Sequence, residues 1–167
     1  MKQTSSGFSL LELLLSVALF AMILIGVAQM INRQGDDAKA SVVALQLKTF
    51  GDAADEYIKD NYSTLLTATP GNTVRVVTFN DIGGYLPNNF TAQNAYGQSM
   101  CVLVKRSPAG SDNLIGLVVT EGGRAIDDVT LGQISATVGG SGGAIYGSNA
   151  AQVGGALGVW KFDVANF

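Results

Sequence analysis

The chain is organised around residues 5–31, SSGFSLLELLLSVALFAMILIGVAQMI. A short polar leader with one lysine, residues 1–7, precedes a hydrophobic run in which Glu12 is the single charged residue. A helix needs about 20 apolar residues to cross the hydrocarbon core of a bilayer, and residues 8–31 supply them. We therefore expect this segment to be inserted in a membrane at some stage of the protein's life.

The leader differs from an ordinary secretory signal in the position of its cleavage site. A secretory signal is cut after its hydrophobic stretch, which is then discarded. Here the candidate cut lies before the stretch, between Gly7 and Phe8, so the hydrophobic helix is kept. Residues 7–12, GFSLLE, resemble the class III leader of type IV prepilins. The resemblance implies that a prepilin peptidase cleaves after Gly7, methylates the new amino terminus on Phe8 and leaves Glu12 in place.

Glu12 needs a partner, because a carboxylate within a membrane helix costs roughly 2.5–3.5 kcal/mol on insertion scales. The prepilin resemblance implies that it pairs with the cationic amino terminus of Phe8 on a neighbouring subunit and so sets the register of a filament. The alternative is a plain anchor helix whose acid sits at the level of the lipid headgroups. That alternative leaves the spacing of Gly7 and Phe8 unexplained.

The composition excludes several functional classes. Only 14% of the 167 residues are charged and the formal net charge is −3, so no basic footprint for nucleic acid is expected. The chain has no histidine, and Cys101 is its single cysteine, which excludes zinc sites built from Cys and His as well as an intrachain disulfide. We expect no cofactor, no metal and no enzymatic activity. Cys101 lies in an apolar run and is expected to be a small buried hydrophobe rather than a reactive thiol.

Other chemically suggestive groups have simpler interpretations. Three pairs of adjacent acids are expected to be helix caps or solvated faces, because neighbouring residues on a helix point in different directions: Asp36 with Asp37, Asp55 with Glu56, and Asp127 with Asp128. The glycine clusters contain no phosphate-binding loop motif and are expected to form turns and close contacts. The five tyrosines are interpreted as packing residues rather than as a binding surface.

The periodicity predicts a long helix followed by an antiparallel sheet, an α+β arrangement. Apolar residues at spacings of three and four over residues 38–62 predict an amphipathic continuation of the membrane helix. Residues 61–72 are expected to be a loop. Strands are predicted over 73–79, 99–106, 114–120 and 156–164, with a hairpin loop at 107–113 and a long connection over 80–98. A short helix is expected over 127–138, with Asp127 or Asp128 near its cap.

Four further stretches together resemble the N-terminal constant region of shufflon-type minor pilins: NAYGQS at 94–99, VVTEGG at 118–123, GQISA at 132–136 and the glycine-rich run 139–146. This resemblance covers roughly residues 38–167 and implies a type IV pilin-like fold. The expected domains are a prepilin leader (1–7), a transmembrane and assembly helix (8–31), its amphipathic continuation (32–62) and a β-rich globular head (63–167).

The leading functional hypothesis is a type IV pilin-like structural subunit, minor or of the type IVb conjugative kind. It is expected to enter the bacterial inner membrane as a precursor and to be cleaved there by prepilin peptidase. It is then expected to assemble with other pilin subunits into an extracellular pilus. One alternative is the stalk of a pilus-tip adhesin that contacts a recipient or host cell surface. Another is a pseudopilin of a type II secretion system.

Overall fold

The computed structural model describes residues 10–166 and divides the chain into two units, Met1–Ala38 and Lys39–Phe167. Helix α1 (Leu10–Asp60) has 51 residues and contributes to both units. Leu and Ala, which are strong helix formers, are the two commonest residues in its sequence. Over the described residues this confirms the predicted long helix, and Gly26 and Gly35 both lie within it.

In the second unit, α1 packs one face against the core. Val43, Phe50 and Ala54 are buried, while Leu47 and Ile58 are partly buried. These are the positions at spacings of three and four that predicted an amphipathic helix. Phe50 is 0% exposed, and its ring stacks with those of Phe79 and Phe90, each at a centroid distance of 6.4 Å.

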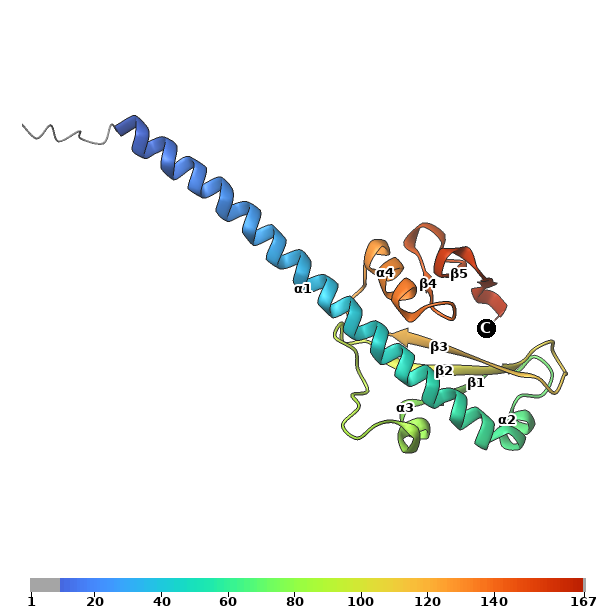
Figure 1. Cartoon of the computed structure of the whole chain (residues 1–167). Helices are drawn as coiled ribbons and strands as arrows, with labels where there is room; N and C mark the ends of the chain where they lie inside the picture. Colours follow the sequence, from blue (N-terminus) through green and yellow to red (C-terminus); the bar gives the residue numbers. More distant parts are fainter. Residues whose placement is uncertain (1–9, 167) are drawn as a thin grey trace, which may run out of the picture. The chain divides into compact units, whose positions relative to one another are not determined.

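The first sheet consists of β1 (Arg75–Thr78), β2 (Ser99–Arg106) and β3 (Leu114–Glu121), antiparallel in the order β1-β2-β3. It lies along the second half of α1 (Figure 1). The predicted hairpin is confirmed, with Val102 of β2 opposite Val118 of β3. Val102 also faces Val77 of β1, so this central row is β-branched, and all three valines lie on the face of the sheet that packs in the core.

The predicted first strand is shorter than expected, because Phe79 begins a helix. In α3 (Phe79–Ile82) the Asp81 carboxylate accepts hydrogen bonds from the Thr78 backbone N–H and the Thr78 hydroxyl, both at 2.8 Å. This capping box starts the helix one residue after Thr78. The helix leads directly into the 3-10 turn η1 (Gly83–Tyr85), so part of the predicted 80–98 connection is helical.

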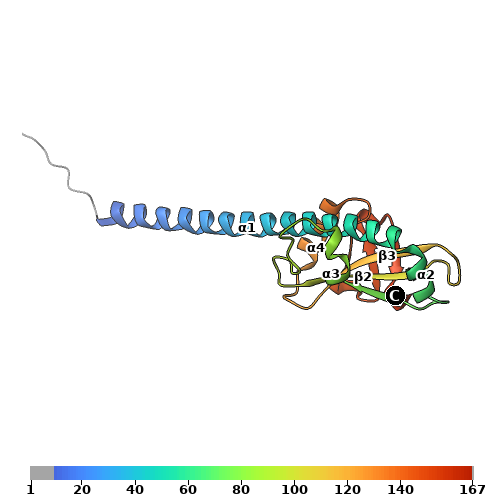
Figure 2. The same cartoon turned by 90° about the horizontal axis from the view of Figure 1, so that it is seen from below.

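The predicted loop at 61–72 is wrong over most of its length, since Tyr62–Ala68 forms α2. Leu65 of this helix is buried against the core, and the buried Thr69 hydroxyl donates to the Leu65 carbonyl at 2.8 Å. Figure 2 shows α2 at the end of the sheet, next to the end of α1. Tertiary packing of Leu65 therefore decides a segment whose local sequence favours a loop.

A second three-stranded sheet replaces the single last strand that was predicted over 156–164. It contains β4 (Gly143–Ile145), β5 (Gln152–Gly155) and β6 (Lys161–Asp163), preceded by α4 (Asp128–Val138). The connecting 3-10 turns are η2 (Gly147–Asn149), η3 (Ala156–Gly158) and, after β6, η4 (Val164–Asn166). Only Lys161–Asp163 of the predicted strand is extended.

Glycine makes this second sheet possible, because the Trp160 ring packs directly on its backbone. A Cβ at Gly143 or Gly155 would lie only 2.5 Å or 2.6 Å from an atom of the Trp160 indole. The indole N–H of Trp160 donates to the Gly140 carbonyl at 3.0 Å. The glycine clusters were expected to form turns and close contacts; Gly143 and Gly155 make such close contacts with the Trp160 ring, but they do so from within strands rather than turns.

Candidate assembly site

The described part of the first unit is an exposed helix that is apolar from Leu10 to Ile31, apart from a few polar residues that include Glu12. Among residues 10–166, α1 is the helix that is long and apolar enough to cross a membrane. None of the residues in its most hydrophobic 18-residue window is buried. The large apolar side chains of this segment are 49–79% exposed: Leu10, Leu11, Leu13, Leu14, Leu15, Val17, Leu19, Phe20, Met22, Ile23, Leu24, Ile25, Val27, Met30 and Ile31. Contiguous apolar surface of this kind marks contact with a membrane or another protein.

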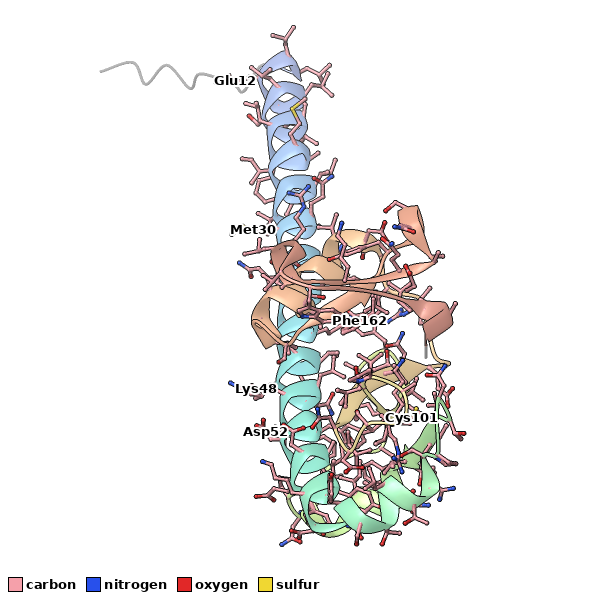
Figure 3. All side chains as sticks on the ribbon, turned by 90° about the vertical axis from the view of Figure 1, so that its right-hand side faces the viewer. Glu12, Met30, Lys48, Asp52, Cys101 and Phe162 are labelled. Carbon is pink, nitrogen blue, oxygen red and sulfur yellow. The ribbon has the colours of Figure 1, made fainter. Side chains whose placement is uncertain are left out.

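Glu12 lies in the first described turn of α1 and is exposed, as its label in Figure 3 shows near the start of the helix. A helix N-terminus carries partial positive charge, which favours an acid at this position. Ser16 lies one turn further along the helix, and its hydroxyl donates to the Glu12 backbone carbonyl at 2.7 Å. Gly7 and Phe8 lie outside the described residues, so the cleavage site and the pairing of Phe8 with Glu12 stay predictions.

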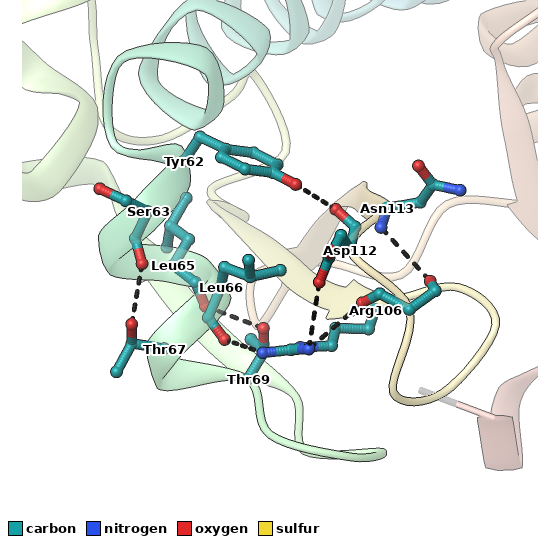
Figure 4. Close-up of polar contacts among 10 residues, drawn as sticks. Tyr62, Ser63, Leu65, Leu66, Thr67, Thr69, Arg106, Asp112 and Asn113 are labelled. Atoms are coloured by element: carbon teal, nitrogen blue, oxygen red, sulfur yellow. Dashed lines mark hydrogen bonds and ion pairs between the residues drawn. The ribbon is translucent and has the colours of Figure 1, made fainter.

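Arg106 ties α2 to the hairpin loop, a contact that the sequence did not reveal. Its Nη2 donates to the Leu66 carbonyl at 2.6 Å and its Nη1 donates to the Ser111 carbonyl at 3.3 Å (Figure 4). The same guanidinium lies 3.8 Å from the Asp112 carboxylate. The Tyr62 hydroxyl donates to the Asp112 backbone carbonyl, so the loop is held to both ends of α2.

The acidic pair Asp127 and Asp128 is structural, as expected. Asp127 is the N-cap of α4: its Oδ1 accepts from the Val129 and Thr130 backbone N–H groups at 3.1 Å and 3.0 Å. The Thr130 hydroxyl donates to the other carboxylate oxygen at 2.7 Å, and these hydrogen bonds lower the pKa of Asp127. Asp128 accepts from the Gly147 backbone N–H at 2.9 Å, which joins α4 to the second sheet.

Several tyrosines have defined partners within the head, in keeping with packing roles. Tyr57 and Tyr85 meet edge to face at 5.8 Å. The Tyr85 hydroxyl donates to an Asp60 carboxylate oxygen at 3.0 Å, and that hydrogen bond raises the pKa of Tyr85. The Arg124 guanidinium lies 5.7 Å from the centre of the Tyr96 ring. Asp60 is near the end of α1, so Tyr85 also fixes the η1 turn against that helix.

Cys101 is half-buried on β2, opposite Thr78 and Val119, rather than fully buried as expected. Burial raises the pKa of its thiol, and the nearby Glu121 carboxylate raises it further. A raised pKa lowers the thiolate fraction, and the thiolate is the reactive form. The environment therefore favours an unreactive thiol. Within residues 10–166, no group of three or more Cys, Asp or Glu side chains is arranged to hold a metal ion.

Comparison with protein-family models gives two matches. Residues 36–167 match the N-terminal constant region of bacterial shufflon proteins. Residues 2–28 match the prokaryotic N-terminal methylation motif, which includes the leader and the start of the apolar helix. No curated protein and no solved structure matches the chain.

Proposed function

This chain belongs to the family of bacterial shufflon proteins, whose N-terminal constant region it matches over most of its length, and on that premise we propose that it is a minor subunit of a type IVb, conjugative-type pilus. It is a type IV pilin-like structural subunit with a leader for prepilin peptidase, and its precursor is anchored in the membrane by α1. The observation that carries the proposal is that the methylation motif at 2–28 includes most of the exposed apolar part of α1. We propose that the assembled pilus is extracellular and that the chain has a structural rather than an enzymatic role.

In the proposed mechanism, the peptidase removes residues 1–7 and methylates the amino group of Phe8. The exposed apolar side chains of α1 then pack against the equivalent helices of neighbouring subunits. The Glu12 carboxylate pairs with the positive amino terminus of the adjacent subunit. An ion pair of this kind is strongest in a low-dielectric surrounding, so it sets the register between the helices.

Co-expression with a prepilin peptidase tests the processing step. N-terminal mass analysis of the purified protein is expected to show loss of residues 1–7 and one methyl group on Phe8. Gly7→Val is expected to keep the leader attached. A wild-type protein that still begins with Met1 after co-expression would refute the proposal.

Fibre yield tests the assembly step. Glu12→Ala is expected to permit cleavage but to reduce the amount of pilus that can be sheared from cells. Glu56→Ala is the matched control, because Glu56 is an exposed acid on the same helix but in the second unit. Normal fibres from Glu12→Ala would disprove the charge pairing while leaving the processing proposal intact.

The resemblance to shufflon minor pilins also supports a second candidate, in which this chain is the stalk of a pilus-tip adhesin that contacts a recipient or host cell. Binding of the intact protein to isolated cell-surface glycans distinguishes the two, since a purely structural subunit binds none. A type II secretion pseudopilin shares the leader and the helix. It is less favoured because the family match extends through the head to residue 167.

A further inference from the structure

A cleft of about 470 Å³ lies within the second unit and is not used by the proposed assembly mechanism. Helices α1 and α4 contribute apolar side chains to it, including Val43, Leu47, Ile58, Leu131 and Ile134. A concave, mainly apolar site of this size is typical of places where a protein binds a partner or ligand.

The edges of both sheets line this cleft. From the first sheet come the consecutive residues 116–120 of β3, and from the second come residues 141–145, which include all of β4. Side chains alternate between the two faces of a strand, so a run of consecutive residues lines a cleft only where the strand presents its edge. The strand orders β1-β2-β3 and β4-β5-β6 place β3 and β4 at sheet edges. Each therefore has a second row of backbone N–H and C=O groups that its own sheet does not use.

Ser135 adds a polar group to the same cleft. This α4 residue lines it and is 1% exposed, yet within the described chain its hydroxyl oxygen has no hydrogen-bond partner. Buried polar groups are nearly always hydrogen-bonded in folded proteins. A ligand with backbone donors and acceptors is the kind that satisfies the two strand edges. It reaches the buried Ser135 hydroxyl only if the wall of the cleft moves.

We propose that this cleft binds an extended segment of a partner polypeptide, which adds as a strand to the edges of β3 and β4. The chemistry of the edges identifies the occupant, because an extended backbone repeats its donors and acceptors at the spacing of a strand. The five lining residues of β3 correspond to a segment of about 16 Å at 3.3 Å per residue. The segment lacks proline, since each proline removes one donor.

The charges at the cleft define one end of the partner segment. Lys48, Asp52 and Asp55 of α1 also line the cleft, so its charged residues have a net charge of −1, from one cation and two anions. Figure 3 shows the Lys48 and Asp52 side chains directed away from the first sheet, and all three charged residues are exposed, so we take them as the rim of the cleft. A basic residue at one end of the partner segment complements this rim.

Peptide binding to the full chain in detergent micelles tests the proposal by fluorescence anisotropy. The probe is a fluorescein-labelled peptide, Lys-Val-Thr-Val-Thr-Val, which has high strand propensity. We expect saturable binding that weakens at least about tenfold when the central valine is replaced by proline, because strand hydrogen bonds are lost. Asp55→Lys is expected to weaken binding about threefold to tenfold at low salt, and Glu56→Lys, a neighbour on α1 outside the cleft, is expected to leave it unchanged.

Hydrogen exchange with the bound peptide locates the site. Amides of β3 and β4 are expected to exchange more slowly, while those of β1 and β6, the edge strands that do not line the cleft, keep their rates. Absence of binding, equal binding of the proline peptide, or protection of β1 instead of β3 would each overturn the proposal. None of these results bears on cleavage after Gly7 or on fibre yield, so failure of this inference is separable from failure of the proposed function.

Discussion

Replacing Arg106 by methionine tests how the head holds α2. The hydrogen bond from Arg106 Nη2 to the Leu66 carbonyl is short, at 2.6 Å, and charge-assisted, so it contributes about 1.5–3 kcal/mol to stability. The contact with Ser111 is longer, at 3.3 Å, and weaker. The ion pair with Asp112 spans 3.8 Å and the Asp112 side chain is 83% exposed, so its contribution is only about 0–1 kcal/mol. We therefore expect Arg106→Met to lower the free energy of unfolding by about 2–4 kcal/mol.

Urea unfolding of the full chain in micelles, followed by circular dichroism, measures this change. Asp112→Asn is the matched control, because it removes the ion pair and keeps the hydrogen bonds of Arg106 to the two carbonyls. It is expected to cost less than about 1 kcal/mol. Hydrogen exchange is expected to accelerate in Tyr62–Ala68 for Arg106→Met alone. If both variants cost the same, or if Arg106→Met leaves stability unchanged, the assignment of the energy to the Leu66 hydrogen bond is wrong.

Three further predictions concern the core, helix α4 and the thiol. Phe50→Ala is expected to lower the free energy of unfolding by about 3–5 kcal/mol in the same urea assay, since the fully buried ring stacks on two others; a cost below 1 kcal/mol would contradict this packing. The lowered pKa of Asp127 means that its carboxylate stabilises the fold above the unfolded pKa near 3.9, and that this contribution is lost as pH falls through the folded pKa. Asp127→Ser keeps a capping oxygen but has no carboxylate, so it is expected to remove the loss of stability that Asp127 contributes at low pH. An acid unfolding curve identical to that of the wild type would refute this. Cys101 is expected to react with iodoacetamide more slowly than free cysteine at pH 8, because its thiol pKa is raised; an equal rate would disprove a shielded thiol.

The elements that follow from local sequence were predicted correctly. The apolar period over residues 38–62 predicted the amphipathic part of α1, and the two apolar runs of β2 and β3 predicted the hairpin that these strands form. The cap at Asp127 follows from the preference of helix N-termini for acids, and the structure confirms it. The roles of Gly7, Phe8 and Glu12 rest on a motif that the sequence itself displays.

The errors occur where distant residues decide local structure. Helix α2 depends on Leu65 entering the core and on Arg106, which lies 40 positions away from its acceptor Leu66. The second sheet depends on Trp160 packing over Gly143 and Gly155, two glycines whose local signal favours turns. The cleft could not be predicted either, because it requires knowing which strands are sheet edges. Periodicity does not carry that information.

The exposed half of α1 limits what can drive assembly. Lipid tails are as apolar as leucine, so moving these side chains from a bilayer into a fibre gains little from the hydrophobic effect. Transfer must instead be favoured by close packing between helices and by polar groups that the bilayer leaves unsatisfied. Glu12 is the one charged residue between residues 10 and 31, so it is the group with most to gain from a cationic partner. We therefore expect a variant whose anchor is equally apolar but lacks this acid to insert into the membrane normally. Its transfer from the membrane into the fibre is expected to be inefficient.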